Sequence, residues 1–148
     1  MQAYPHRYEV HAAAETEGSV LVRSEGLPTL TTAPPPQFGG AGGQWSPETL
    51  LVAAAADCFI LTFRAIAKLS KLRWIALTCE AAGTVDRVDR VTQFTAFSVR
   101  ASLQVPEGTN EEQAKRLLAR AEQTCLITNS LKASCQLETD VRVTQHAT

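Results

Sequence analysis

The side chains of this sequence best suited to covalent chemistry are its four cysteines, which are far apart along the chain and form no C-x-x-C pair: Cys58, Cys79, Cys125 and Cys135. The thiolate is the reactive form of cysteine, so each thiol can react only as far as its surroundings lower its pKa. Cys79 and Cys135 fall in predicted strands, in phase with apolar neighbours. This pattern indicates two buried structural thiols.

The other two cysteines lie in helical patterns. Cys125 falls where such a pattern breaks, just before "LITNSLK". A cysteine that opens a new helical segment faces amide donors and the helix dipole, which lower its pKa. The sequence therefore leaves a functional and a structural role open for Cys125. Cys58 occurs in the apolar segment "ADCFILTFRA", and this pattern alone favours a buried structural thiol.

Composition limits the class of protein. A chain of 148 residues, 45% of them hydrophobic, is long enough for one domain with its own core, and we predict a single domain over residues 1–148. The net charge is −1 and no basic tract occurs, which argues against binding to nucleic acid or an anionic membrane. We expect a cytoplasmic protein, because the N-terminus lacks a signal-peptide pattern and the apolar segment 49–66 carries Asp57 and Arg64.

The histidines are not placed to form a metal site together with the cysteines. The three histidines occur near the chain ends, and no Cys/His cluster surrounds them: His6, His11 and His146. Their spacing does not predict a metal site.

A helix is predicted to carry Cys58. Ser46 is a suitable N-cap, Pro47 suits the first helical position, and Glu48 suits the positive end of the helix dipole. The helix is apolar around most of its circumference, which indicates a central, buried element that packs against a partner. The residues that define its main apolar stripe are Leu51, Ala54, Cys58, Leu61, Thr62, Ala65 and Leu69.

The remaining pattern predicts an α+β domain. Short strands occupy residues 6–32, a long hairpin with apolar and polar residues alternating along its second half occupies 74–105, and a last strand covers 135–143. Asn110 opens and caps a second helix, whose predicted core face is Ala114, Leu117, Leu118 and Ala121. We expect largely antiparallel sheets with the helices on one side. The segment "APPPQFGGAGGQW" is a predicted loop, either a plain linker or a place where backbone approaches something closely.

Three segments resemble the OsmC/Ohr family, the osmotically induced and organic-hydroperoxide-resistance proteins. The first of them, "RSEGLPTLTTAPPPQFGG", fits the strands that precede the family's glycine-rich loop. "FGGAGGQWSPETLLVAAAADCF" is similar to the family's glycine-rich loop and the helix with its peroxidatic cysteine, and "CLITNSLKASCQLETDV" to its second-cysteine motif, usually C-P-x-S. The order of elements fits over nearly the whole chain. The resemblance implies an OsmC-like fold with a central buried helix in an intertwined homodimer.

The resemblance also implies a chemistry. Cys58 would attack a hydroperoxide and become a sulfenic acid, and Cys125 would resolve it as a disulfide. A dithiol reductant, lipoyl-linked in the better-known branch, would restore both thiols, without a metal or organic cofactor. Glu48 matches the family's catalytic carboxylate. Because ten residues of helix rise about 15 Å, Glu48 can meet Cys58 only if the helix is broken or if Glu48 comes from a second chain.

The family's arginine, which holds the cysteine as thiolate, is missing here. Glu17 lies near its place in one branch, and Gln37, before Phe38, takes it in the other. Leu126 also replaces the proline of C-P-x-S, and Thr128 its serine. Without a cation we expect burial, and a nearby Glu48, to raise the pKa of Cys58. The other arginines that could fold into the site are Arg7, Arg23 and Arg64.

Two functions follow from these residues. The first is a peroxidase that reduces organic hydroperoxides through Cys58, Cys125 and Glu48. The alternative, which the missing arginine motivates, is a non-catalytic protein of the same fold that binds a small hydrophobic or thiol-reactive ligand at the dimer interface.

Overall fold

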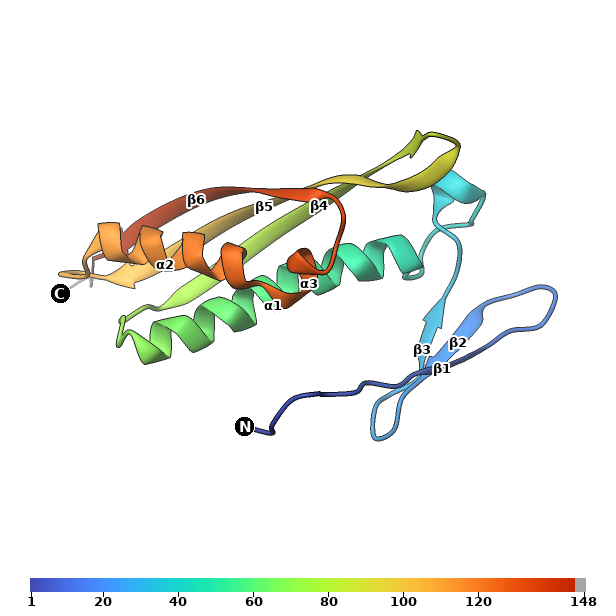
Figure 1. The fold of residues 1–148 in the computed structure, drawn as a ribbon, viewed down its shortest axis with the longest axis horizontal. Helices are drawn as coiled ribbons and strands as arrows, with labels where there is room; N and C mark the ends of the chain where they lie inside the picture. The colour runs from blue at the N-terminus through green and yellow to red at the C-terminus, as the bar shows by residue number, and fades with distance from the viewer. Residues whose placement is uncertain (146–148) are drawn as a thin grey trace. The chain divides into compact units, whose positions relative to one another are not determined.

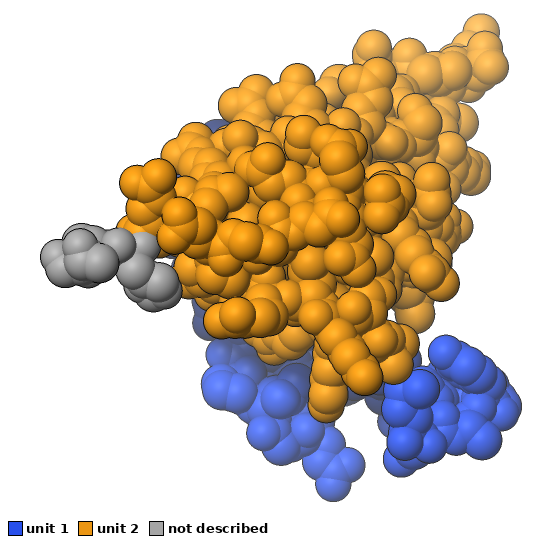
Figure 2. Space-filling view, turned by 90° about the vertical axis from the view of Figure 1, so that its left-hand side faces the viewer, with its two compact units in different colours: residues 1–51 blue, residues 52–148 orange. Residues whose placement is uncertain are grey.

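The structure, a computed structural model, describes residues 1–145. The chain divides into two compact units, residues 1–51 and residues 52–148, which Figure 2 shows in blue and orange. Helix α1 (Pro47–Leu69) begins in the first unit and continues in the second.

The first unit holds a small antiparallel sheet. Its strands are β1 (His11–Ala13), β2 (Val20–Arg23) and β3 (Leu30–Thr32), in the order β1-β2-β3. A short 3₁₀ helix, η1 (Pro36–Phe38), follows. The sheet is a meander of short strands joined by turns, as the sequence predicts for residues 6–32.

The glycine-rich loop packs on its own backbone. A Cβ atom at position 40 would collide with the carbonyl oxygen of Pro34, so only glycine fits there. The amide of Gly40 donates a hydrogen bond to the Pro35 carbonyl at 3.1 Å, and the amide of Ala33 donates to the Trp45 carbonyl at 2.9 Å. The sequence left open whether this loop is a plain linker or a place of close backbone approach. The structure shows a close approach between two backbone segments of the loop itself.

The second unit holds a longer sheet in the order β4-β5-β6, covered by helices (Figure 1). Strands β4 (Ala76–Val88) and β5 (Val91–Pro106) form the predicted antiparallel hairpin. Strand β6 (Ser134–Thr144) pairs parallel to β5, so the chain must cross over between them. Helices α2 (Glu111–Thr124) and α3 (Leu126–Asn129) make that crossover.

The core of the second unit lies between the sheet and the helices. Alternate residues of β5 point toward α1 and α2, which both cover the same face of the sheet (Figure 1). The α2 face predicted from spacing is fully confirmed as core. The buried hydrophobic residues of this cluster are Phe59, Phe63, Ala67, Val99, Ala101, Leu103, Val105, Ala114, Leu117, Leu118 and Ala121.

Helix α1 turns a different face to the core than the sequence predicted. The buried stripe is Ala55, Phe59, Phe63 and Ala67, four residues apart. Leu61 and Leu69, which belong to the predicted stripe, are 50% and 85% exposed. The helix is apolar on two faces, and the face with two phenylalanines has more surface to bury against the sheet. The second apolar face remains open.

The exposed apolar face of α1 bears on whether this helix could span a membrane. By length and composition α1 could cross a membrane, contrary to the sequence expectation: its most apolar 18-residue window has a mean hydropathy of 1.9, and 22% of that window is buried. Core helices pass the same test. Here one face of α1 is packed on the sheet by Phe59 and Phe63, so the helix is an integral part of the core.

Phe63 should contribute strongly to the packing of α1 against the sheet. It is 0% exposed and packs edge-on against Trp74, with ring centroids 5.5 Å apart. We expect Phe63→Ala to lower the free energy of unfolding by about 3–5 kcal/mol, because it leaves a large cavity. Urea denaturation measures this change. The exposed neighbour provides the control: Arg64→Ala should change stability by less than about 0.5 kcal/mol, and equal effects of the two variants would contradict the packing described here.

Candidate active site

A capped helix start fixes the helix that carries Cys58. The Ser46 hydroxyl accepts a hydrogen bond from the amide of Thr49 at 3.1 Å, and the Thr49 hydroxyl accepts one from the amide of Ser46 at 2.9 Å. Ser46 is therefore the N-cap that the sequence predicts. Cys58 lies beside the buried stripe, next to Phe59, and is half-buried.

Cys125 lies at the junction between α2 and α3. Its amide donates a hydrogen bond to the Glu122 carbonyl at 3.2 Å, and its own carbonyl accepts one from the Thr128 hydroxyl at 3.4 Å. The residue is 1% exposed. The break in the helical pattern at Cys125 is thus a real junction, with a short second helix directly after it.

The fold brings the two cysteines together. A hydrogen bond joins the thiols of Cys58 and Cys125, although 67 positions (125 − 58) separate them in the sequence. The Cys58 sulfur also shares a hydrogen bond with the Thr62 hydroxyl, one helical turn further on, at 3.8 Å. Two thiols in contact can form a disulfide once one of them is oxidised.

The surroundings of Cys58 favour its thiolate. Burial by itself raises the pKa of the Cys58 thiol, but the backbone amide of Ile127, the Cys125 thiol, the Thr62 hydroxyl and the backbone amide of Leu126 all donate to the sulfur. The net effect is a pKa below the ordinary value. The expectation that Cys58 would have a raised pKa without an arginine is therefore wrong, because hydrogen bonds to a thiolate stabilise it as a cation would.

Cys125 has the opposite environment. Burial raises the pKa of its thiol, the amide and hydroxyl of Thr128 lower it, and the hydrogen bond to Cys58 together with the Cys58 charge raises it again, so that the pKa ends above the ordinary value. The sequence assigned the donors of the new helix to Cys125. In the structure the amide of Thr128 does lower the pKa of Cys125, but the amides of Ile127 and Leu126 donate to Cys58, so only part of the new helix's donors acts on Cys125.

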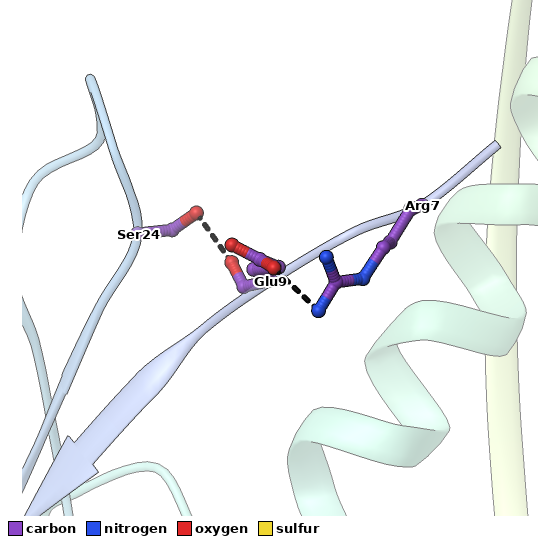
Figure 3. Close-up of polar contacts among 3 residues, drawn as sticks. All are labelled: Arg7, Glu9 and Ser24. Atoms are coloured by element: carbon purple, nitrogen blue, oxygen red, sulfur yellow. Dashed lines mark hydrogen bonds and ion pairs between the residues drawn. The ribbon is translucent and has the colours of Figure 1, made fainter.

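The lowered pKa of Cys58 does not come from a charged side chain. In the part of the chain that the structure describes, every group that lowers the pKa of Cys58 is an uncharged hydrogen-bond donor. Arg64 is exposed on α1. Arg7, in the first unit, forms an ion pair with Glu9 at 2.6 Å, while the backbone carbonyl of Glu9 accepts a hydrogen bond from Ser24 (Figure 3).

Glu48 is not brought to Cys58 within the chain. Helix α1 is continuous from Pro47 to Leu69, so the two residues are separated by about 15 Å of helix rise. Of the two alternatives for their cooperation, a broken helix is excluded and a second chain remains. One oxygen of Glu48 is buried and has no hydrogen-bond partner among residues 1–145, which is an unfavourable state for a carboxylate.

Cys79 and Cys135 are partly buried and stay protonated. Burial and neighbouring negative groups raise the pKa of each thiol to about 11. Residues 1–145 also contain no group of three or more His, Cys, Asp or Glu side chains that could hold a metal ion. Sequence reasoning missed Thr62 and the amide of Leu126 as contacts of Cys58. Only the spacing of Thr62, four residues after Cys58 on one helix, could have indicated its role.

The α+β fold, with antiparallel-rich sheets and a long central helix, is the fold of OsmC-like proteins. The chain belongs to the OsmC-like protein family, which matches residues 40–140. The OsmC/Ohr proteins include cysteine-based peroxidases.

Individual relatives agree with this assignment. The curated protein YmaD of Bacillus subtilis, which is uncharacterized, is 26% identical over 112 residues, 74% of this chain and 75% of YmaD. An OsmC-like protein of unknown function from Vibrio cholerae superposes with a TM-score of 0.82 at 18% identity, over 91% of this chain and 99% of the other. An organic hydroperoxide resistance protein OsmC from Legionella pneumophila gives 0.74 at 24% identity, over 95% and 100%. The expected OsmC-like α+β fold of the single chain is thereby confirmed, while the intertwined homodimer stays a prediction.

The role of the Leu126 amide can be tested by deleting a single N–H group. Proline is suited to the first position of a helix, and Cys125 before it already has the extended conformation (φ −62°, ψ 117°) that a following proline requires. We expect Leu126→Pro to raise the pKa of Cys58, because a donor to the thiolate is lost. The pH profile of Cys58 alkylation should therefore shift to higher pH.

Leu126→Ala is the matched control for that variant. The Leu126 side chain is 62% exposed, so its removal should leave the alkylation profile unchanged while the amide is kept. Identical profiles for the alanine and proline variants would show that this amide does not stabilise the thiolate.

Proposed function

We propose that the protein is a thiol-dependent peroxidase that reduces organic hydroperoxides. The observation that carries this proposal is the contact between Cys58, whose pKa is lowered, and Cys125, whose pKa is raised. A peroxidase needs one thiol that ionises readily for attack and a second in reach to resolve the product, and the lowered pKa of Cys58 and its contact with Cys125 support these two roles. Membership in a family that includes such enzymes supports it.

The reaction proceeds in two steps at this pair. The Cys58 thiolate attacks the outer oxygen of the hydroperoxide, the O–O bond breaks, and the alkoxide takes up a proton and leaves as an alcohol. Cys58 is then a sulfenic acid. The Cys125 thiol attacks its sulfur, a Cys58–Cys125 disulfide forms, and water leaves. An external dithiol, of which a lipoyl group is one example, reduces the disulfide.

The apolar surroundings of Cys58 favour organic peroxides. The face of α1 that remains outside the core carries apolar side chains near Cys58, including Ala54 and the half-exposed Leu61. An alkyl or aryl group gains from contact with such a surface, whereas hydrogen peroxide has no apolar part to bury. We therefore assign organic hydroperoxides as the substrate class.

We further propose that the active form is a homodimer in which Glu48 serves the partner's site. Two observations support it: the apolar face of α1 that stays outside the core, and the buried Glu48 oxygen that lacks a donor among residues 1–145. A two-fold interface would bury the same face of both chains. A carboxylate near the bound peroxide can accept its proton and orient it.

Peroxide treatment tests the catalytic cycle. One equivalent of cumene hydroperoxide should remove two hydrogens from the reduced protein, as intact-mass analysis measures, and peptide mapping should detect the Cys58–Cys125 bond. Cys58→Ser should abolish the reaction. Cys125→Ser should allow one oxidation and then accumulate over-oxidised Cys58, because the resolving thiol is gone. If both thiols of the wild-type protein stay alkylatable for minutes, the peroxidase is excluded and the ligand-binding function takes its place.

A mixture of two inactive variants tests whether Glu48 acts across the dimer. Glu48→Gln and Cys58→Ser each damage both sites of their own homodimers. After the two are unfolded and refolded together in equal amounts, half of the dimers are mixed, and each has one intact site if Glu48 acts in the partner. Peroxidase activity should then recover to about a quarter of the wild-type value. Activity that stays at the level of the separate variants would place Glu48 and Cys58 in one chain's site.

A further inference from the structure

Thr62 is the only member of the apolar stripe predicted for α1 that carries a hydroxyl group. It is half-buried, and it lies at the border between the core face, to which Phe63 belongs, and the open face, to which Leu61 belongs. A hydroxyl group in apolar surroundings is unfavourable unless it has a hydrogen-bond partner. The partner of this hydroxyl therefore indicates what Thr62 contributes.

The Thr62 hydroxyl is directed at the sulfur of Cys58, 3.8 Å away. A threonine inside a helix commonly donates to the backbone carbonyl four residues earlier. Thr124 does so in the last turn of α2, where its hydroxyl donates to the Arg120 carbonyl at 2.8 Å. Thr62 also contacts the residue four positions earlier, but through the side chain of that residue. Its hydroxyl thus contacts the atom that reacts with peroxide.

This hydroxyl differs from the other donors to the sulfur in that it can rotate. The amides of Leu126 and Ile127 are held in the backbone of α3, whereas a hydroxyl group turns about its C–O bond and can both donate and accept. When Cys58 is a thiolate, the hydroxyl must be the donor. When an oxygen atom is bound to the sulfur, a small rotation lets the hydroxyl donate to that oxygen instead.

We propose that Thr62 assists the second step of the peroxidase reaction by donating a hydrogen bond to the oxygen atom that Cys58 takes from the peroxide. This inference rests on the proposed function, since the peroxidase reaction places that oxygen on the sulfur. Thr62 then belongs to the reacting group together with Cys58 and Cys125, because its hydroxyl contacts the reacting atoms in both steps.

The step that Thr62 assists is the resolution of the sulfenic acid. The Cys125 sulfur attacks the Cys58 sulfur, the S–S bond forms, and the S–O bond breaks with its electron pair on the oxygen. That oxygen takes up the proton that Cys125 loses and leaves as water, so no further reagent is needed. Thr62 keeps its own proton. Its hydrogen bond stabilises the negative charge that develops on the leaving oxygen.

The reduced protein tests the contact on which this proposal stands. Thr62→Val removes the hydroxyl but keeps a β-branched side chain, and the Cys125 thiol, the titratable group that also acts on Cys58, is unchanged. We expect the pH midpoint of Cys58 alkylation to rise, because the thiolate loses a donor. Thr62→Ser keeps the hydroxyl and should restore the wild-type profile. If the profile of Thr62→Val equals that of the wild type, the contact is absent and the inference is overturned.

The peroxide reaction of the full-length protein tests the role itself. The reduced protein is mixed with one equivalent of cumene hydroperoxide, at a pH above the alkylation midpoint of every variant. Samples are quenched at successive times with dimedone, which traps sulfenic acid, and mapped by mass. We expect Thr62→Val to form the sulfenic acid of Cys58 but to close the disulfide at least about tenfold more slowly, since it lacks a hydrogen bond to a developing charge. Thr62→Ser should close it at nearly the wild-type rate.

Thr124→Val is the matched control, because it removes a helical threonine hydroxyl that donates to a backbone carbonyl of α2. It should leave both the alkylation profile and the rate of disulfide formation unchanged. Urea denaturation checks that each variant is folded. If Thr62→Val is not, Thr62→Ala provides the same comparison, because alanine is the residue most favourable to a helix.

The outcomes separate this inference from the proposed function. If the variant without the hydroxyl closes the Cys58–Cys125 disulfide as fast as the wild type, the role of Thr62 is overturned and the peroxidase stands. If dimedone-labelled Cys58 accumulates in that variant and the serine variant restores resolution, the role is established. If the wild type forms neither sulfenic acid nor disulfide, the proposed function fails and this inference fails with it.

Discussion

The chemistry of this protein depends on hydrogen bonds that converge on one sulfur atom. The amides of Ile127 and Leu126, the thiol of Cys125 and the hydroxyl of Thr62 all donate to Cys58, and together they outweigh the effect of burial on its pKa. Backbone amides supply fixed partial charges that need no counter-ion and no long side chain. The site therefore stabilises a thiolate in apolar surroundings although the arginine expected from the resemblance is missing.

The leucine that replaces proline after the second cysteine contributes to the hydrogen bonds on the Cys58 sulfur. A proline at position 126 would have no N–H group to donate, whereas Leu126 contributes one of the hydrogen bonds to Cys58. The departure from the usual C-P-x-S pattern and the loss of the arginine thus act in opposite directions on the same thiolate. Together they account for a pKa of Cys58 below the ordinary value in a sequence without the family's arginine.

The sheet of the second unit holds these donors in place. Phe59 and Phe63 pack α1 onto β5, and Leu117 and Leu118 pack α2 onto the same face, so the two helices are held over one core. The parallel pairing of β6 requires the crossover that contains Cys125, and the junction between α2 and α3 lies in that crossover. The position of Cys125 is therefore a consequence of the topology.

Most of the elements and of the core could be predicted from local patterns in the sequence. Alternation along β5, the spacing of Ala114, Leu117, Leu118 and Ala121, and the caps at Ser46 and Asn110 are local patterns, and local patterns are set by backbone geometry. The sequence could not decide which face of α1 is buried, since both faces are apolar and only the sheet selects between them. Nor could it assign the amides of Leu126 and Ile127 to Cys58. That contact joins residues nearly seventy positions apart, and only the tertiary packing of α1 against the α2–α3 junction brings them together.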